Sequence, residues 1–282
     1  MAQPLHWNRK KEAMSLDLST IFGRDRDILI GMVHLRALPG TPASGAAPTA
    51  ITSQAVEEAR TLADAGFDAI LIENMHDTPY MLRDVGPEIV ACMTAVCAAV
   101  RAEVDVPIGV QVLAGANRAA MAVAHAGGAQ FIRAEGFCFT AVADEGLMSE
   151  ADAGPLLRYR RSIDADHIAV LADIRKKHSS HALTADLSMA EWAQGAEFMG
   201  ADGVIVTGAA TGTPTDMQEA TDAANACGLP VFVGSGVTDQ TVRATLDIAH
   251  GAIVGSSLKE GGQWRNKVDR QRATNLVSSR NS

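Results

Sequence analysis

Eight short apolar segments alternate with helical patterns along this chain, and the alternation limits the fold more than any other feature of the sequence. Residues 52–65, for example, carry apolar side chains at helical spacing and stop at Gly66, a residue type that commonly ends helices. Strands separated by helices form parallel sheets with right-handed crossovers. The predicted strands are residues 28–34, 69–73, 108–112, 130–133, 168–173, 204–207, 231–233 and 252–254.

Two architectures can hold eight such units, an open doubly wound sheet and a closed barrel. The open sheet more often carries a GxGxxG turn after its first strand, whereas residues 34–40 read His-Leu-Arg-Ala-Leu-Pro-Gly. The length of 282 residues also fits one barrel domain, whose typical size is about 250 residues. We therefore predict an α/β fold, a single (β/α)8 TIM barrel over residues 28–282.

Two segments fall outside the regular repeat. Residues 1–27 are predicted to form an N-terminal arm that packs on a neighbour, caps the bottom of the barrel or frays. Residues 137–166 are longer than a crossover requires. We expect part of them, with Phe137, Phe139 and residues 144–146, to lie across the top of the barrel as a lid.

Several helix ends can also be read from the sequence. Pro87 suits the first position of a helix. Capping-box patterns that begin at Ser188 and Thr215 predict two further helix starts. A last helix near residues 268–277 would complete the barrel.

The composition is that of an ordinary soluble enzyme. Hydrophobic residues make up 47% of the chain and aromatic residues 4%, so we expect a core of Val, Ile, Leu and Ala. The net charge of −9 argues against nucleic acid or an anionic membrane as the main partner. A small anionic metabolite stays compatible with it, because loop geometry can bind phosphate in an acidic protein.

Cysteine spacing and the N-terminus bear on the compartment. Cys92, Cys97, Cys138 and Cys227 form no CxxC pair, so reduced thiols are expected. No apolar run approaches the length of about eighteen residues typical of a membrane span, and residues 1–11 lack the apolar region of a signal peptide. We expect a cytoplasmic protein without a membrane span, and a homo-oligomer.

Two glycine and serine turns follow the last two predicted strands. In (β/α)8 barrels, the loops after strands 7 and 8 often bind phosphate through backbone N–H groups, which glycine allows to approach closely. Tight turns without a ligand are the alternative interpretation. The predicted phosphate-binding residues are Gly234, Ser235, Gly236, Gly255 and Ser256.

Polar residues end several of the other apolar strands. Active sites of such barrels lie at the C-terminal ends of the strands, and an unpaired buried polar group costs about 1–3 kcal/mol. We therefore predict that these groups meet a substrate. The candidate catalytic residues are Glu73, Asp173, His34, Lys177 and His178, and the candidate substrate-binding residues are Asn74, Gln111, Glu135, Thr207 and Gly208.

Each candidate also has a structural interpretation. Lys177 can be the cation that pairs with Asp173 or Glu135 in a purely structural bridge. His34 can be a hydrogen-bonded core histidine. The carboxylates and histidines could form an oxygen and nitrogen site for a divalent metal, but no HxH or HExxH spacing supports one, so we predict no cofactor and no resident metal.

The motifs together resemble the BtpA/SgcQ family over nearly the whole chain from about residue 20. The resemblance is carried by the segments 31–35, 38–40, 72–74, 85–88, 107–113, 171–173, 177–178, 206–208, 211–212, 233–237 and 254–259. The founding member of that family is linked to photosystem I biogenesis. The resemblance implies a phosphate-binding barrel, and it implies the fold more firmly than an activity.

The turn after the fourth strand departs from the family pattern. Many members have a turn of the form Arg-Val-Asn-Val-His there, whereas residues 133–139 read Arg-Ala-Glu-Gly-Phe-Cys-Phe. An acid and two aromatic residues thus replace neutral polar groups at the expected mouth. A substrate or a photosynthetic role therefore does not transfer from one branch of the family to another.

The sequence favours an enzyme that acts on a phosphorylated sugar or ribosyl compound. Glu73 and Asp173 would be acid and base, with Lys177 or His178 stabilising the charge that develops. Isomerase or lyase chemistry, or N-glycosidic cleavage, suits two carboxylates near a sugar. The alternative is a non-catalytic binding or assembly factor of the BtpA type.

Overall fold

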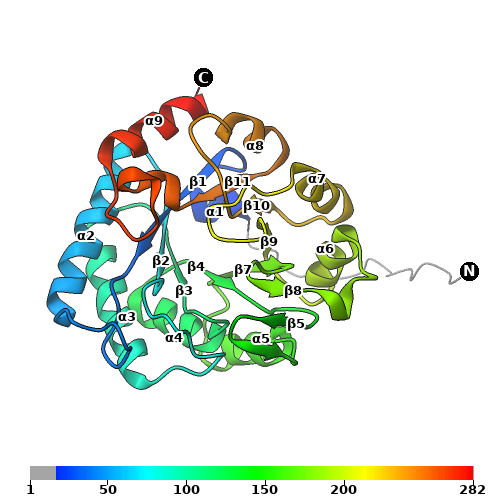
Figure 1. The fold of residues 1–282 in the computed structure, drawn as a ribbon, viewed down its shortest axis with the longest axis horizontal. Coiled ribbons are helices and arrows are strands. Elements are labelled where there is room, and N and C mark those ends of the chain that lie inside the picture. The colour runs from blue at the N-terminus through cyan, green and yellow to red at the C-terminus, as the bar shows by residue number, and fades with distance from the viewer. Residues whose placement is uncertain (1–16, 282) are drawn as a thin grey trace, which may run out of the picture.

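The computed structural model describes residues 17–281, in which the eight predicted strands close into a parallel barrel (Figure 1). The ring closes because β1 (Ile28–His34) pairs with both β2 (Ala69–Glu73) and β11 (Gly251–Val254). The remaining barrel strands are β3 (Ile108–Gln111), β4 (Phe131–Ala134), β7 (Ala169–Ile174), β9 (Gly203–Val206) and β10 (Val231–Val233). The predicted TIM barrel is confirmed.

Helices surround the strands on the outside of the ring (Figure 1). They are α2 (Pro48–Ala65), α3 (Pro87–Arg101), α4 (Asn117–Gly127), α5 (Ala153–Ser162), α6 (Met189–Phe198), α7 (Met217–Ala226), α8 (Val242–Ile248) and α9 (Arg270–Asn281). Their apolar faces pack on the outward side chains of the strands and form the larger hydrophobic core. The outer side of the barrel wall is therefore covered by apolar side chains.

One of the two predicted capping boxes is correct. The Ser188 hydroxyl accepts a hydrogen bond from the backbone N–H of Glu191, whose carboxylate in turn accepts the N–H of Ser188. The box predicted at Thr215 is wrong, because α7 begins one residue later with Asp216 as its cap. The Thr215 hydroxyl instead donates to the backbone carbonyl of Ser235, in the turn after β10.

Large and small residues alternate around the interior of the barrel. A Cβ atom on Gly109 would lie 2.1 Å from the ring of Phe131, and one on Gly251 would lie 2.7 Å from Phe232. These glycines therefore make room for the two rings, both of which are fully buried. The core consists mainly of Val, Ile, Leu and Ala, as expected, and in the interior two phenylalanines fill the space that glycines leave.

A short helix closes the N-terminal end of the barrel. α1 (Leu18–Phe22) lies within the ring of strands in the view of Figure 1 and packs on the interior cluster. The ring centre of Phe22 lies 5.4 Å from that of Phe131 and 6.0 Å from that of Phe232. This part of the predicted arm thus caps the bottom of the barrel, and residues 1–16 lie outside the described residues.

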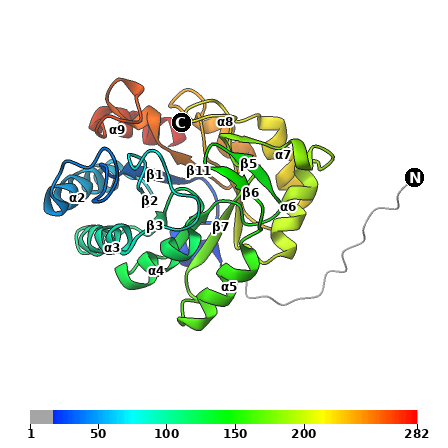
Figure 2. The same ribbon diagram turned by 60° about the horizontal axis from the view of Figure 1, so that its bottom comes forward.

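The opposite end carries a small antiparallel sheet of β5 (Ala141–Ala143), β6 (Gly146–Met148) and β8 (Ser179–Ser180) (Figure 2). The tip of its hairpin brings Glu145 to within 3.5 Å of the Lys176 ammonium, just beyond β7. The hairpin of the predicted lid segment therefore lies at the C-terminal end of the barrel, and its role as a lid stays a prediction.

The two aromatic residues of that segment do not face the mouth. Phe137 is fully buried in the outer core, and Phe139 packs edge-on against Trp192 at a ring distance of 4.6 Å. The expectation that they replace polar groups at the mouth is wrong, because hydrophobic burial draws both rings between the barrel and its helices.

A buried ion pair fastens the end of the last strand to the outer ring. The Lys259 ammonium lies 2.8 Å from the carboxylate of Glu58 on α2, and Lys259 has no exposed surface. Its backbone N–H donates to the carbonyl of Ser256, in the short 3-10 helix Ser256–Leu258. The pair therefore holds the turn after β11 in place.

Lys259→Met should lower the free energy of unfolding by roughly 3–5 kcal/mol, because it leaves the Glu58 carboxylate buried without its cation. Urea unfolding followed by circular dichroism measures the loss. In the double variant Glu58→Leu with Lys259→Met, both charges are removed and most of the loss should be recovered. A single variant as stable as the wild type would contradict a structural role for this pair.

Candidate active site

A ring of polar residues and glycines lies at the C-terminal end of the barrel. Successive side chains of a strand point to opposite faces of the sheet, so residues two positions apart point the same way. In each strand, the residue two positions after the last apolar side chain of the barrel interior therefore also points into the barrel. The register places His34 beside Glu73, and Glu73 beside Gln111. The members of this ring are His34, Glu73, Gln111, Arg133, Asp173, Thr207, Gly234 and Gly255.

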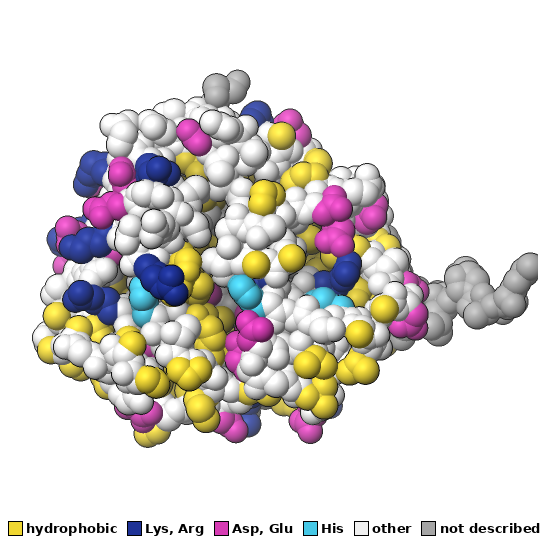
Figure 3. All heavy atoms as spheres, in the orientation of Figure 1, with side chains coloured by type: hydrophobic (Ala, Val, Ile, Leu, Met, Phe, Trp, Pro, Cys, Tyr) yellow, Lys and Arg dark blue, Asp and Glu magenta, His cyan; other side chains and the backbone are white. Residues whose placement is uncertain are grey.

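A cavity of about 760 Å³ opens at this end of the barrel. Eight of the predicted site residues line it, namely His34, Glu73, Lys177, Gly234, Ser235, Gly236, Gly255 and Ser256. Seven others are not among its lining residues, namely Asn74, Gln111, Glu135, Asp173, His178, Thr207 and Gly208. In the space-filling view, histidine side chains lie near the middle of this face beside acidic and basic ones (Figure 3).

The lining of the cavity is positively charged, although the whole chain carries a net charge of −9. Arg133, Lys177, Arg265 and Arg272 contribute cations, whereas Glu73 is the acidic residue among the lining residues. Clefts lined by one sign of charge concentrate ligands of the opposite sign. The cavity therefore favours an anion.

The two glycine and serine turns lie side by side along one wall of this cavity. The Ser257 hydroxyl donates to the carbonyl of Val237 at 2.6 Å and so ties the turns together. Within residues 17–281, the backbone N–H groups of Ser235, Gly236, Ser256 and Ser257 have no hydrogen-bond acceptor. Free N–H groups beside an open cavity are the donors that phosphate sites use.

The hydroxyls of the predicted phosphate-binding serines differ. Ser235 donates its hydroxyl proton inward, to the carbonyls of Thr213 at 2.9 Å and Ala210 at 3.3 Å. The Ser256 hydroxyl has no partner within the described part of the chain. Of the two side chains, Ser256 is therefore the one free to contact a ligand.

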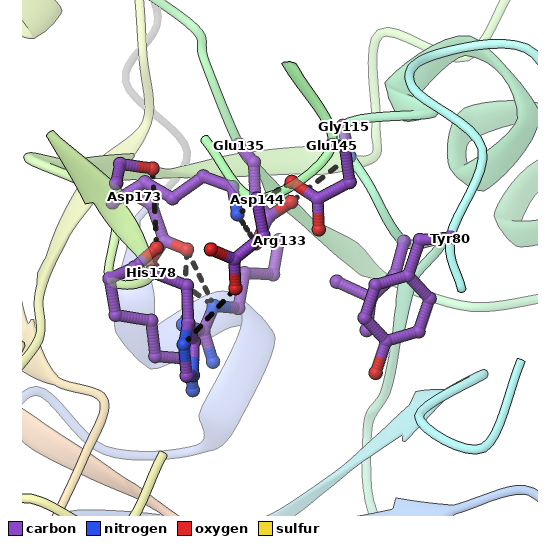
Figure 4. A network of polar contacts seen from close by, with 12 residues as sticks. Tyr80, Gly115, Arg133, Glu135, Asp144, Glu145, Asp173 and His178 are labelled. Atoms are coloured by element: carbon purple, nitrogen blue, oxygen red, sulfur yellow. Dashed lines mark hydrogen bonds and ion pairs between the residues drawn. The ribbon is translucent and has the colours of Figure 1, made fainter. Parts of the chain in front are cut away.

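Arg133 and Asp173 form a buried ion pair at the centre of the mouth (Figure 4). The guanidinium Nε and Nη2 atoms donate to the carboxylate at 3.0–3.1 Å, and both side chains are at most 2% exposed. The pairing of Lys177 with Asp173 is therefore wrong as a prediction, because the planar guanidinium of Arg133 reaches both carboxylate oxygens from the neighbouring strand.

The predicted alternative for Lys177, a pair with Glu135, is also wrong. The Lys176 ammonium lies 3.7 Å from Glu135 and 3.5 Å from Glu145, and the second oxygen of Glu135 accepts the N–H of Gly115 at 3.0 Å (Figure 4). Burial raises the pKa of the Glu135 carboxyl. This cluster joins the lid hairpin to the barrel.

His34 and Glu73 form a second buried pair, at the cavity wall. His34 Nδ1 lies 3.0 Å from the carbonyl oxygen of Trp264, which can only accept, so Nδ1 carries the proton. His34 Nε2 then faces Glu73 Oε2 at 3.5 Å as an acceptor.

The proton positions of this pair follow from its burial. Burial lowers the pKa of His34 well below its ordinary value, and the charge of Lys259 lowers it further. Burial also raises the pKa of the Glu73 carboxyl. Both shifts favour the neutral forms of the two groups.

The remaining predicted residues support loops or lie in the ring without a partner. Asn74 accepts the N–H of Leu113 and donates to Asp77, so it links the turns after β2 and β3. Gln111 Oε1 and Thr207 Oγ1 are buried and have no hydrogen-bond partner among the described residues. Gly208 allows a tight turn, because a Cβ there would lie 2.4 Å from a backbone oxygen of the same loop.

His178 connects the lid hairpin to the loop after β9. Its Nε2 accepts the backbone N–H of Thr211 at 3.1 Å, and its Nδ1 lies 3.6 Å from the Asp144 carboxylate. These contacts place His178 between two loops and outside the cavity wall.

Sequence reasoning missed several residues of the cavity. Arg133 was recognised as a strand end but not as the partner of Asp173. Trp264, Arg265 and Arg272 lie beyond the last strand, where no local pattern predicts that the chain folds back over the mouth. The stacking of Arg265 on Trp264, at 4.5 Å from the ring centre, is visible only in three dimensions.

Residues 17–281 hold no group of three His, Cys, Asp or Glu side chains arranged to bind a metal ion. They also contain no helix with the length and apolar character that crossing a bilayer requires.

Comparison with known proteins identifies relatives along almost the whole chain. The BtpA family model matches residues 25–282. A Caenorhabditis elegans protein described as mitochondrial is 42% identical over 94% of this chain and 97% of its own length. The photosystem I biogenesis protein BtpA of Synechocystis is 36% identical over 89% of this chain and 87% of its own length.

Solved structures resemble the chain in fold. Thiamine phosphate pyrophosphorylase of Pyrococcus furiosus aligns with a TM-score of 0.55 at 13% identity, covering 91% of this chain and 96% of that one. N-(5'-phosphoribosyl)anthranilate isomerase of the same organism aligns with a TM-score of 0.54 at 13% identity, covering 90% and 98%. At these identities the likeness concerns the barrel fold.

The two mouth carboxylates should respond oppositely to neutral substitution. Asp173→Asn leaves the buried Arg133 without its anion and should cost roughly 3–5 kcal/mol of unfolding free energy. Glu73→Gln should melt at or above the wild-type temperature at pH 7. The reason is that the raised pKa of Glu73 makes the wild type lose stability as the pH rises through that folded-state value.

Thermal melts of both variants between pH 3.5 and 8 provide the measurement. The advantage of Glu73→Gln should disappear as the pH falls below about 4.5, the ordinary pKa of a glutamate, because the carboxyl is then protonated in both states. A Glu73→Gln variant that is less stable than the wild type at pH 7 would contradict the neutral His34–Glu73 pair.

Proposed function

The chain belongs to the BtpA family, and from that premise we propose that it is an enzyme that acts on a phosphorylated sugar or ribosyl compound. One observation carries the proposal. A single cationic cavity joins two turns with free N–H groups to the buried Glu73 and His34 and the half-buried Lys177. The anion site and the titratable groups are thus within reach of one small molecule.

The structural neighbours support the substrate class. Thiamine phosphate pyrophosphorylase and phosphoribosylanthranilate isomerase are, by their names, barrel enzymes whose compounds carry phosphate. Fold likeness alone does not transfer a reaction. It agrees here with the charge and the free N–H groups of the cavity, which are properties of this chain itself.

The phosphate is assigned to the wall formed by the two turns. The N–H groups of Ser235, Gly236, Ser256 and Ser257 and the Ser256 hydroxyl would bind its oxygens. A Cβ on Gly234 would meet Ile205 at 2.7 Å, so packing inside the barrel requires glycine there, whereas a Cβ on Gly255 would lie in ordinary contact with His34 at 3.4 Å. Arg272, which donates to the Ser257 carbonyl at 3.1 Å, adds a cation at the rim.

The proton-transfer role is assigned to Glu73, and Asp173 positions Arg133. A buried carboxyl with a raised pKa, beside an imidazole that can accept its proton, suits general acid and base catalysis near neutral pH. Asp173 is committed to Arg133, whose guanidinium also lines the cavity. Isomerisation, aldol-type cleavage and N-glycosidic cleavage are the reactions that this set of groups suits.

A second candidate function is supported by one relative. The Synechocystis protein, 36% identical to this chain, is named for photosystem I biogenesis. A non-catalytic binding or assembly factor of that kind would use the barrel as a scaffold. In that case the cavity residues should tolerate substitution, whereas outer surfaces should not.

The phosphate site is tested with Ser256→Ala and inorganic phosphate. A hydrogen bond to a charged group is worth about 1.5–3 kcal/mol, so the variant should bind phosphate roughly 10-fold to 100-fold more weakly by calorimetric titration. Ser53→Ala, on the exposed face of α2, is the matched control and should bind like the wild type. Unchanged affinity in both Ser256→Ala and Arg272→Ala would place the anion elsewhere.

The catalytic role is tested with Glu73→Gln on a panel of phosphorylated aldoses, ketoses and ribosyl compounds. Loss of a general acid or base should lower turnover by roughly 10²–10⁴-fold while phosphate affinity persists. The control is Glu57→Gln. Glu57 lies on the exposed side of α2, one turn after Ser53, and this variant should retain full activity. Absence of wild-type turnover on every compound, together with normal phosphate binding, would favour the assembly factor.

A further inference from the structure

Two consecutive lysines, Lys176 and Lys177, follow β7, and their ammonium groups lie in opposite electrostatic surroundings. The Lys176 ammonium is buried between Glu135 and Glu145. Burial alone would lower the pKa of Lys176, but the two carboxylates raise it. Lys176 is thus held as a structural cation.

Lys177 has no such partner. Within residues 17–281, its ammonium group takes part in no hydrogen bond or ion pair, although its side chain lines the cavity together with Glu73 and Arg133. Of the nearby carboxylates, Asp173 is bound by Arg133 and Glu135 by Lys176, whereas Glu73 faces His34. Burial, and then the charge of Arg133, lower the pKa of Lys177.

An unpaired lysine at this place is costly for stability, because a half-buried ammonium group loses part of its hydration without gaining a counter-ion. The same surroundings increase the fraction of free amine, which is the nucleophilic form. Desolvation and a cationic neighbour are the two devices by which proteins activate lysine for attack on carbonyl carbon. The phosphate turns border the same cavity, so a bound phosphate ester would hold its carbon chain near this amine.

We propose that Lys177 is a catalytic nucleophile that forms an imine with the carbonyl carbon of an open-chain phosphorylated aldose or ketose. The inference rests on the proposed function and narrows it. A carbonyl substrate selects isomerisation or aldol-type cleavage over N-glycosidic cleavage, because an imine withdraws electrons from the bonds next to the former carbonyl carbon.

The step balances with the groups of the cavity. The free amine of Lys177 adds to the carbonyl carbon, and the oxygen takes up the proton that the nitrogen releases, which gives a carbinolamine. The Glu73 carboxyl then donates its proton to that hydroxyl, water leaves, and a protonated imine remains beside the Glu73 carboxylate. The new cation thus forms next to an anion that the same step creates. Water returns by the reverse sequence to release the product.

The carboxylate left on Glu73 has a second use. It can accept a proton from the carbon next to the imine, which is the step that isomerisation requires, or from a hydroxyl, which is the step that aldol-type cleavage requires. His34 Nε2, 3.5 Å from Glu73, accepts a hydrogen bond when that carboxyl is protonated again. No external oxidant or metal enters this sequence.

Trapping with cyanoborohydride tests the proposal, since this reagent reduces imines but reacts slowly with free carbonyls. The wild type is incubated with glycolaldehyde phosphate or dihydroxyacetone phosphate and the reagent, and the adduct is mapped by mass spectrometry. The adduct should form on Lys177 and not on the paired Lys176. It should disappear in Lys177→Arg and decrease when excess inorganic phosphate competes for the cavity. Dihydroxyacetone, which lacks phosphate, should label much less.

The outcomes separate this inference from the proposed function. If Lys177→Arg and the wild type both bind inorganic phosphate but no adduct forms on Lys177, the imine is refuted and the phosphate site stands. If the wild type binds no phosphate, the proposed function fails first. Equal labelling of Lys177 and the exposed Lys267, or labelling that excess phosphate does not reduce, would show general amine reactivity and would overturn the proposal.

Discussion

The ion pair between Arg133 and Asp173 determines how the rest of the mouth is arranged. It lies at the level where the apolar interior of the barrel ends, and both charges are almost fully buried. A bidentate guanidinium satisfies the carboxylate so completely that no other cation is needed beside it. Within residues 17–281, Lys177 is consequently left without an ion-pair partner, and Glu73 faces His34 rather than an arginine.

The two ends of the barrel differ in the kind of side chain that the strands contribute to them. At the N-terminal end, α1 brings Phe22 against Phe131 and Phe232, and the interior is sealed by hydrophobic packing. At the C-terminal end, the same strands contribute polar side chains that need partners. Gln111 and Thr207 have buried oxygens there without a partner among residues 17–281, which is expected where a ligand or water completes the site.

The two glycine and serine turns at the cavity wall depend on support from outside the cavity. Lys259 and Glu58 hold the turn after β11 against α2, and the Ser257 hydroxyl fastens it to the turn after β10. Backbone N–H groups bind phosphate well only when they are fixed before the ligand arrives. The buried ion pair behind the turns therefore helps to fix the free N–H groups to which we assign the phosphate.

The sequence by itself determined the barrel, because the alternation of apolar strands and helices depends on local periodicity, and it determined which residues stand at the strand ends. That was enough to bring His34, Glu73 and the turns at Gly234 and Gly255 to one cavity. Only the tertiary structure decided which charges pair. The choice between Arg133 and Lys177 as the partner of Asp173 depends on side-chain reach across neighbouring strands, and the return of Trp264, Arg265 and Arg272 over the mouth depends on contacts between segments far apart in the chain. Periodicity carries no information about either, since pairing energies depend on distance and burial in three dimensions.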